Sequence, residues 1–317
     1  MTEDFRQHLD RVRDAVGSVL VGQRAAVDEV LAAMLAGGHV LLEGAPGVAK
    51  TLLARSLAKV LGLEFRRVQF TPDLMPSDVV GTKLFDFQQS AFRMHLGPVF
   101  TQVLLADEIN RTPPKTQSAL LEAMQEHQVT IDGETHRLPQ PFFVVATQNP
   151  LEFEGTYPLP EAQLDRFMVK VEMGYPTADE ELDVYRRFVE GRLGDAGDDP
   201  PVDRVMDAEK IAALRAVVRG VHVEGSVLQY LRNLMRATRE ARTVALGASP
   251  RAAVHLAGAA RAAALLAGRD YVTPDDVRRM ALPVLRHRLV PTPEAELERY
   301  TPADAVRGAL DAVPVPR

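Results

Sequence analysis

The stretch from His39 to Leu61, HVLLEGAPGVAKTLLARSLAKVL, limits how this chain can fold more than any other. Its apolar start, Val40 to Leu42, predicts a buried strand of a parallel sheet. After Lys50, leucine and valine recur at helical spacing with no Gly or Pro before Gly62, which predicts a helix that begins near Lys50. The residues between strand and helix, Gly44 to Ala49, therefore form a tight turn.

This turn has the chemistry of a phosphate-binding loop. The first N–H groups of the helix have no intrahelical partners, and together with the positive end of the helix dipole they face the turn. Lys50 would reach the β and γ phosphates of a nucleotide, and the Thr51 hydroxyl would hold Mg²⁺. The stretch departs once from the pattern G-x-x-x-x-G-K-[ST], because Ala49 stands at the second Gly position. The alternative is a strand–turn–helix with no ligand. The expected nucleotide contacts are Gly44, Ala45, Pro46, Gly47, Val48, Ala49, Lys50, Thr51 and Leu52.

Composition narrows the class of protein. With 317 residues the chain is long enough for two domains, and its 46% hydrophobic and 25% charged content is typical of globular proteins. The polar start does not resemble a signal peptide, and no apolar run approaches the ~18 residues that cross a membrane, so we expect a cytoplasmic protein without membrane insertion. The lack of cysteine excludes disulfides, thiolate metal sites and cysteine nucleophiles. A net charge of −6 disfavours a chain-wide nucleic-acid surface.

A pair of acids provides the second chemical motif. Val103 to Leu105 predicts another buried strand, and Asp107 and Glu108 follow at its carboxyl end, where open α/β sheets bind ligands. Asp107 would bind Mg²⁺ directly or through water, while Glu108 would polarise the attacking water as a general base. Two acids at a strand end also occur as helix caps, so the catalytic interpretation of this pair depends on the presence of the Lys50 loop.

Three further polar residues occupy positions suited to catalysis. Asn149 ends the apolar strand FFVVATQN and could position a water beside the γ-phosphate, or simply end the strand before Pro150. Arg166 stands at a helix end just before the fifth predicted strand, Met168 to Met173. Arg251 is the second helical residue after a Ser cap, a place suited to a phosphate. For either arginine, a plain surface role is the alternative.

The other patterns predict the remaining elements, in one region before residue 177 and in a helical region after it. An amphipathic helix is expected over residues 2–19, a break at 21–23 and a helix at 24–35. Alternation predicts hairpins at 82–96 and 129–138, the second with Asp132-Gly133 as a type I′ turn. Residues 71–81 are expected to be irregular, and 191–201 a flexible linker. From residue 177 the pattern is helical, with caps at Thr177, Ser249, Thr273 and Thr301 and no strand pattern.

Together these motifs resemble those of the AAA+ ATPases, and within them the MoxR family of the helix-2-insert clade. GAPGVAKT resembles Walker A, LLADE Walker B, the end of ATQN sensor 1, LDRF the trans-acting arginine finger, and GASPRA sensor 2. More specific to MoxR proteins are FTPDLMPSDVVG, LADEINRTPPKTQSALLEAMQE and GTYPLPEAQLDRF. Ala49 agrees with what loops of this family often show. The resemblance covers nearly the whole chain.

The resemblance implies a fold and an assembly. The fold is a three-layer αβα P-loop NTPase domain, residues 1–175, with a five-stranded parallel sheet and β-hairpin insertions, followed by an all-α lid domain, residues 176–317. Residues 82–96 match the helix-2 insert and residues 129–138 the pre-sensor-1 hairpin. Val21, Gly22 and Gln23 are expected near the adenine. Members form homo-hexamers that bind ATP and Mg²⁺ at subunit interfaces and act as chaperone-like remodellers, commonly with a separate protein that has a von Willebrand factor A domain.

Two other functions fit parts of the sequence. A nucleotide-gated scaffold would bind ATP and scarcely hydrolyse it, but it would not need Glu108, Asn149 or Arg166. A DNA-acting motor of the same clade would use the hairpins on nucleic acid. The first hairpin, however, holds only Lys83, Arg93 and His95 as basic residues, which is few for backbone contacts that depend on phosphate neutralisation. The sequence names neither the client nor the partner.

Overall fold

The computed structural model describes residues 2–150, 155–193 and 199–316. Its centre is a parallel sheet of five strands in the order β2-β5-β8-β1-β9, as predicted. The bounds are β1 Val40–Glu43, β2 Phe65–Gln69, β5 Val103–Asp107, β8 Phe143–Gln148 and β9 Val169–Glu172. The three inner strands are buried almost throughout because both faces of the sheet are covered.

Alternation along the strands divides the apolar core into two layers. Val40 and Leu42 of β1 join one cluster, and Leu41 between them joins the other. The first cluster includes α1 (Thr2–Val19), α2 (Arg24–Leu35) and α3 (Lys50–Val60), and the second includes α5 (Pro114–Glu126). These layers confirm the predicted αβα arrangement.

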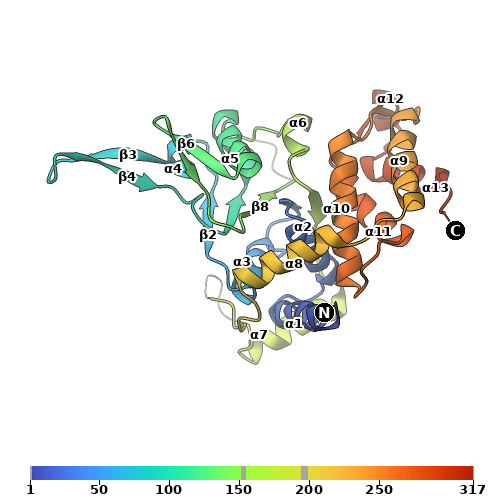
Figure 1. Ribbon diagram of the computed structural model, residues 1–317, viewed down its shortest axis with the longest axis horizontal. Coiled ribbons are helices and arrows are strands. Elements are labelled where there is room, and N and C mark those ends of the chain that lie inside the picture. Colours follow the sequence, from blue (N-terminus) through green and yellow to red (C-terminus); the bar gives the residue numbers. More distant parts are fainter. Residues whose placement is uncertain (1, 151–154, 194–198, 317) are drawn as a thin grey trace.

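Two hairpins stand outside this sheet, at the predicted places. One joins β3 (Gly81–Asp86) to β4 (Ala91–Leu96), and the other joins β6 (Gln128–Ile131) to β7 (Glu134–Arg137). Figure 1 shows β3 and β4 reaching far from the body of the molecule. The Asp132-Gly133 turn has positive φ at both residues, 48° and 82°, as a type I′ turn requires.

Two short helices lie in segments between these elements. Residues 71–81, predicted as irregular, contain a short helix, α4 (Pro76–Val80), which begins with Pro at its first position. The 3₁₀ turn η1 (Ile109–Arg111) lies between β5 and α5.

The remaining elements are helices, with one exception. The helices are α6 (Glu161–Leu164), α7 (Ala178–Val189), α8 (Ala208–Gly220), α9 (Gly225–Glu240), α10 (Pro250–Leu266), α11 (Pro274–Leu285), α12 (Pro293–Leu297) and α13 (Pro302–Ala312). All four predicted residues are N-caps, and the hydroxyls of Thr177, Ser249 and Thr301 accept a backbone N–H, as Ser249 does from Ala252 at 3.1 Å. At Thr273 the N–H and the hydroxyl instead donate to Asp276. The exception is the antiparallel pair β10 (Val244–Leu246) and β11 (Val290–Pro291), too short to leave an alternating pattern in the sequence.

The helical region is packed directly on the sheet domain. α10 contacts α2 and α11, and α8 contacts α2, so one apolar cluster continues from the sheet into the helices. The division expected between residues 175 and 176 stays a prediction. The central part of the predicted linker, residues 194–198, lies outside the described residues. Among the described helices, none has the length and apolar character needed to cross a bilayer.

Candidate functional site

The loop between β1 and α3 has the backbone of a phosphate-binding turn. Gly47 has φ of +84°, and Gly44 lies so close to the next strand end that an added Cβ would meet the Met173 carbonyl oxygen at 2.4 Å. The Lys50 ammonium donates to the Gly44 and Ala45 carbonyls at 2.5 and 3.2 Å. The Lys50 side chain is thus held over the loop from which it would contact phosphates.

Ala49 explains the departure from the usual loop pattern. It is the N-cap of α3 and adopts the left-handed conformation, with φ 67° and ψ 28°. Glycine adopts this region without penalty, whereas a residue with a Cβ pays roughly 1–2 kcal/mol. The loop therefore keeps the conformation that favours Gly, and Ala49 adopts it under strain.

The sheet brings the predicted acids and amide beside this loop. Strands β5, β8 and β1 are neighbours, and their registers place Asp107, Thr147 and Leu42 in one row across the sheet. Strands in a sheet are about 4.8 Å apart, so the ends of β5 and β1 lie roughly 10 Å from each other. Asn149, 6% exposed, follows β8 between them. The loop, the two acids and the amide therefore lie together at one end of the sheet.

Asp107 is held in a fixed orientation. One carboxylate oxygen accepts the buried Thr147 hydroxyl at 2.6 Å, and the other accepts Arg67 Nε at 2.9 Å. The Thr147 oxygen also accepts the Glu108 N–H at 2.9 Å. A single threonine therefore fixes both acids relative to β8.

Glu108 has a strained backbone. Its φ of 58° and ψ of 50° lie in the left-handed region, where non-glycine residues cost of order 1–3 kcal/mol and cluster at functional sites. Its carboxylate accepts Gln69 Nε2 at 2.6 Å and Arg111 Nη1 at 3.0 Å. The strain turns this side chain out of the strand, toward polar partners at the sheet edge.

The segment 21–23 reaches the same end of the sheet. Gln23 Nε2 donates to the Gly174 carbonyl at 2.9 Å, just beyond the Met173 carbonyl that touches Gly44. Val21 and Gly22 line a cavity of about 460 Å³ that α1 and α7 also border. No residue from Gly44 to Leu52 lines this cavity, so the expected contact of residues 21–23 with the adenine stays a prediction.

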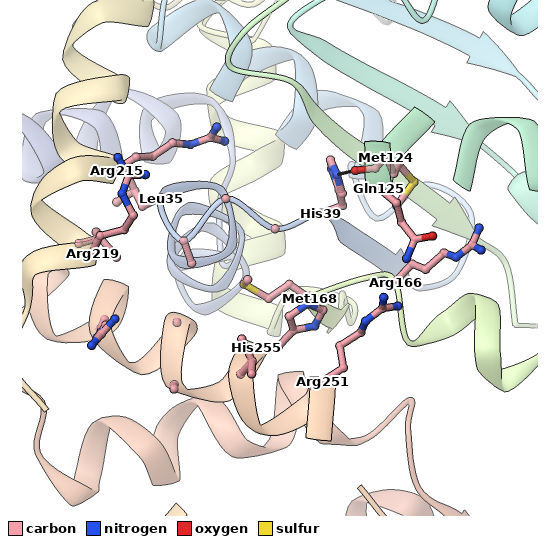
Figure 2. Close-up of a pocket in the computed structure, with 18 of the residues that line it drawn as sticks. Leu35, His39, Met124, Gln125, Arg166, Met168, Arg215, Arg219, Arg251 and His255 are labelled. Atoms are coloured by element: carbon pink, nitrogen blue, oxygen red, sulfur yellow. Dashed lines mark hydrogen bonds between the residues drawn. The ribbon is translucent and has the colours of Figure 1, made fainter. Parts of the chain in front are cut away.

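Arg166 and Arg251 lie elsewhere. Both line a second cavity, which also includes His39 and Met168, the residues that immediately precede β1 and β9. This is the amino edge of the sheet, whereas the Lys50 loop follows the carboxyl end of β1. Four residues of β1 span about 13 Å, so the two ends of this strand, where the loop and the second cavity lie, are about that far apart. Figure 2 shows their side chains extending in the same direction from different elements. Of the predicted catalytic residues, the structure brings Glu108 and Asn149 to the end of the sheet where the loop lies. Arg166 and Arg251 lie at the other end.

A buried arginine anchors the segment that carries Arg166. Arg288, with 2% of its side chain exposed, donates through Nε to Asp165 Oδ1 at 2.6 Å and through Nη2 to the Phe167 carbonyl at 2.5 Å. Nη1 donates to the Met168 carbonyl at 3.1 Å, and Nη2 also donates to His255 Nδ1. Burial and the Arg288 charge lower the pKa of His255 to about 4, which keeps it a neutral acceptor.

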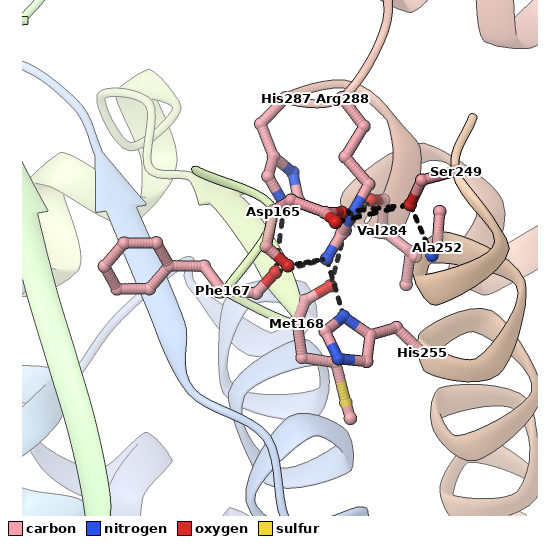
Figure 3. Close-up of polar contacts among 9 residues, drawn as sticks. All are labelled: Asp165, Phe167, Met168, Ser249, Ala252, His255, Val284, His287 and Arg288. Atoms are coloured by element: carbon pink, nitrogen blue, oxygen red, sulfur yellow. Dashed lines mark hydrogen bonds and ion pairs between the residues drawn. The ribbon is translucent and has the colours of Figure 1, made fainter. Parts of the chain in front are cut away.

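The same network reaches Arg251. The Ser249 hydroxyl, which caps α10, also lies 3.3 Å from an Asp165 oxygen. Arg251 is in the first turn of that helix. Figure 3 shows how Ser249, Asp165 and Arg288 converge from three parts of the chain. The arrangement ties both surface arginines to one buried ion pair.

Sequence reasoning gave these supporting residues no role. Thr147 belongs to the predicted strand FFVVATQN, and Arg67 and Gln69 belong to the stretch Glu64 to Phe70, EFRRVQF, which also reads as a strand. For Arg67 and Gln69 the one sequence signal is that polar residues stand between the apolar residues of this stretch. Arg288 had no signal, because its partner Asp165 is 123 residues away in the chain.

Comparisons with known proteins agree with this fold. The family model described as "ATPase family associated with various cellular activities (AAA)" matches residues 39–169, and the model of the AAA lid domain matches residues 236–308. The chain is 47% identical to the uncharacterized protein YeaC of Bacillus subtilis, over 99% of this chain and 97% of that one. It is 43% identical to the chaperone MoxR1 of Mycobacterium tuberculosis, over 98% and 82%. Protein MoxR of Methylorubrum extorquens is 32% identical, over 100% and 97%.

A solved structure shows the same architecture. A candidate ATPase from Cytophaga hutchinsonii superposes with a TM-score of 0.90 at 41% identity, and the match covers 100% of this chain and 97% of the other. The agreement therefore includes the helical lid as well as the sheet domain.

Proposed function

This chain belongs to the MoxR family of AAA+ ATPases, and from that premise we propose that it hydrolyses ATP with Mg²⁺ in a homo-hexameric ring and remodels other proteins. The observation that carries the proposal is the division of the catalytic groups between two edges of one sheet. The Lys50 loop, Glu108 and Asn149 occupy the carboxyl edge, and Arg166 and Arg251 the amino edge. One subunit cannot bring both sets to one nucleotide, whereas adjacent subunits of a ring can.

The carboxyl edge would bind the triphosphate. Backbone N–H groups of the loop and the Lys50 ammonium would contact the phosphates, after Lys50 leaves the Gly44 and Ala45 carbonyls. Thr51 and Asp107 fit a Mg²⁺ site, because this cation takes few protein oxygens and completes its shell with phosphates and water. A bound Mg²⁺ would neutralise charge on the β and γ phosphates.

Glu108 would activate the attacking water, and Asn149 would help to orient it. The Glu108 carboxylate would first have to exchange Gln69 and Arg111 for that water. Both arginines of the amino edge would act in trans. Arg166 and Arg251 would neutralise charge on the transferring phosphoryl group in the neighbour's site, a contribution that is typically ~10³–10⁵ in rate for an arginine finger.

The hairpins are the proposed contact with clients. Lys83 of β3 pairs with Glu134 of β7 at 2.7 Å, so the two hairpins are joined, and Arg93 pairs with Asp86. These pairs neutralise most of the basic charge of the first hairpin, which favours a protein partner over nucleic acid. The name of the relative MoxR1 describes that protein as a chaperone, which also supports protein clients for this chain. We further propose a cytoplasmic location and a separate partner protein with a von Willebrand factor A domain.

Three variants test the proposed chemistry. Lys50→Ala should lose roughly 1.5–3 kcal/mol of ATP affinity, the value of a charge-assisted contact. Glu108→Gln should bind ATP and not hydrolyse it. Mixing Arg166→Ala with Lys50→Ala subunits, each inactive alone, should restore turnover where an intact loop meets an intact arginine. Wild-type turnover by a protein shown to be monomeric would refute action in trans.

The same variants separate the motor from a scaffold. A scaffold would keep its assembly and its partners when Glu108 is changed to Gln, and the wild type would show almost no phosphate release. Pull-down with Glu108→Gln in ATP should capture the client of a motor. Unchanged release of phosphate on addition of DNA, at low and high salt, would exclude a DNA-stimulated motor.

A further inference from the structure

The cavity that holds Arg166 and Arg251 extends well beyond them. It has a volume of about 680 Å³ and lies between the end of α2, the start of β1, and helices α8 and α10. Its lining includes five arginines and no aspartate or glutamate: Arg166, Arg215, Arg219, Arg251 and Arg261. In a chain whose net charge is −6, so one-sided a lining is unusual.

The arginines form two groups. Arg251 and Arg261 are ten residues apart on α10, which is about 15 Å along a helix. Arg215 and Arg219 are one turn apart on α8 and project from the same face. Figure 2 shows Arg215 and Arg219 on the opposite side of the cavity from Arg166 and Arg251. The inner group, from α8 and the far part of α10, is therefore separate from the two arginines proposed to act on a neighbour's nucleotide.

The inner arginines lack counter-charges. Arg215 donates through Nε to the Met34 carbonyl at 2.9 Å, but its buried Nη2 and the buried Nε of Arg261 have no hydrogen-bond partner. No ion pair joins any of the five arginines to a carboxylate of the described chain. By contrast, Arg288, which is more deeply buried, has a carboxylate and four carbonyls as partners. A partly buried charge without a partner is costly unless a ligand compensates it.

The positive charge in the cavity affects the pKa values of groups that line it. Burial and the nearby Arg219 lower the pKa of Arg215 to about 10, so it remains a cation at neutral pH. Burial lowers the pKa of His39 to about 3, with a smaller contribution from Arg215. The fold thus maintains a positive field in a partly enclosed cavity, an arrangement that concentrates anions.

We propose that the inner arginines, Arg215, Arg219 and Arg261, form a polyphosphate-binding site distinct from the Lys50 loop. The planar guanidinium groups match phosphate oxygens in pairs, and several of them together suit a ligand with more than one negative charge. The cavity volume falls in the range of small-molecule sites. The phosphate has two possible sources, a free phosphate compound or the nucleotide held by a neighbouring subunit.

A binding experiment tests the site without turnover. Inorganic pyrophosphate is titrated calorimetrically into Lys50→Ala protein, in which the loop's own phosphate contact is removed. The same titration follows in that background with Arg215→Gln/Arg261→Gln. The matched control is Arg11→Gln/Arg242→Gln, which removes two charges from exposed arginines outside the cavity. A second titration uses a non-hydrolysable ATP analogue and assembled protein with an intact Lys50, carrying either pair of substitutions.

The outcomes identify the source or refute the site. Pyrophosphate bound by Lys50→Ala, and bound at least tenfold more weakly with the cavity pair but not with the control pair, indicates a free compound. No pyrophosphate binding, with the ATP analogue at least tenfold weaker only for the cavity pair, indicates the neighbour's nucleotide. Equal binding by cavity and control pairs in both titrations overturns the proposal. An inactive ATPase would still give either positive result, so failure of the proposed function would be seen separately.

Melting temperatures provide an independent check. Because the inner arginines are uncompensated, the cavity pair should melt at the temperature of the control pair or above it. A clearly lower melting temperature together with unchanged binding would make these arginines structural and overturn the proposal.

Discussion

Removal of the Arg288 guanidinium should disable the segment that carries Arg166 and leave the Lys50 loop intact. Arg288→Met keeps most of the apolar volume of the side chain but leaves the Asp165 carboxylate without its buried partner. It also leaves the Met168 carbonyl without its Arg288 donor, the Phe167 carbonyl with His287 as its remaining partner, and His255 without its cation. Breaking a buried ion pair from one side costs about 3–5 kcal/mol. Water can enter beside Asp165, which is 22% exposed, so we expect the lower end of that range.

The functional consequence follows from position. Arg166 lies between the residues that Arg288 holds, so its guanidinium should lose its fixed direction and turnover by the assembled protein should fall by at least tenfold. ATP affinity should not change, because the Lys50 loop lies at the other edge of the sheet. Mixed with Lys50→Ala subunits, Arg288→Met subunits should regain activity, since their loops can meet intact arginines. Arg288 is a positioning residue in this account, and rescue by mixing is a result that general damage to the fold would not give.

A matched control is available two residues away. Arg286 also lies in a mostly buried position, and its partner Glu172 is 60% exposed, which limits the value of that pair to about 0–1 kcal/mol. Arg286→Met should therefore change stability and turnover little. Urea unfolding, ATP binding and phosphate release are measured for both variants. Wild-type turnover by Arg288→Met, or loss of ATP binding along with turnover, would refute the assigned role.

Three further variants probe other parts of the molecule. Phe87 and Phe92 at the tip of the first hairpin are 86% and 71% exposed. Replacing residues 86–92 by a Gly-Ser turn should therefore change the free energy of unfolding by less than about 0.5 kcal/mol, while partner-stimulated ATPase activity falls. A large drop in melting temperature would show instead that the tip covers the core. Ala49→Gly should retain ATP binding and raise the free energy of unfolding by up to about 1 kcal/mol, because relief of the left-handed strain exceeds the added backbone entropy; clear destabilisation in urea would contradict this. Burial raises the pKa of Glu29 from 4.5 to about 7, so the stability due to its protonated form is full below pH 4.5 and is lost as the pH rises through 7. Glu29→Gln should flatten this slope in urea unfolding between pH 4.5 and 7.5, and an unchanged slope would count against it.

Local chemistry in the sequence was enough to predict that the Lys50 loop, the two acids and Asn149 lie at one edge of the sheet. The strand, turn and helix around Lys50 are contiguous, so hydrophobic spacing and Gly placement predict their conformation directly. Parallel strands that end in Asp107, Glu108 and Asn149 must present these groups at one edge of a sheet, whatever their order. Both hairpins were predicted for a similar reason, because alternation and the Asp132-Gly133 turn are local signals.

What the sequence could not determine depends on contacts between distant segments. The strand order places β8 between β5 and β1, and only that order lets Thr147 hold both acids. The left-handed Glu108 and Ala49 are imposed by the surrounding structure against local preference. The pair of Arg288 with Asp165 and the cavity of unpaired arginines arise where the lid meets the sheet. One arginine looks like another in sequence, and burial and the partners that packing brings within reach decide which of them is neutralised and which remains free to bind a phosphate.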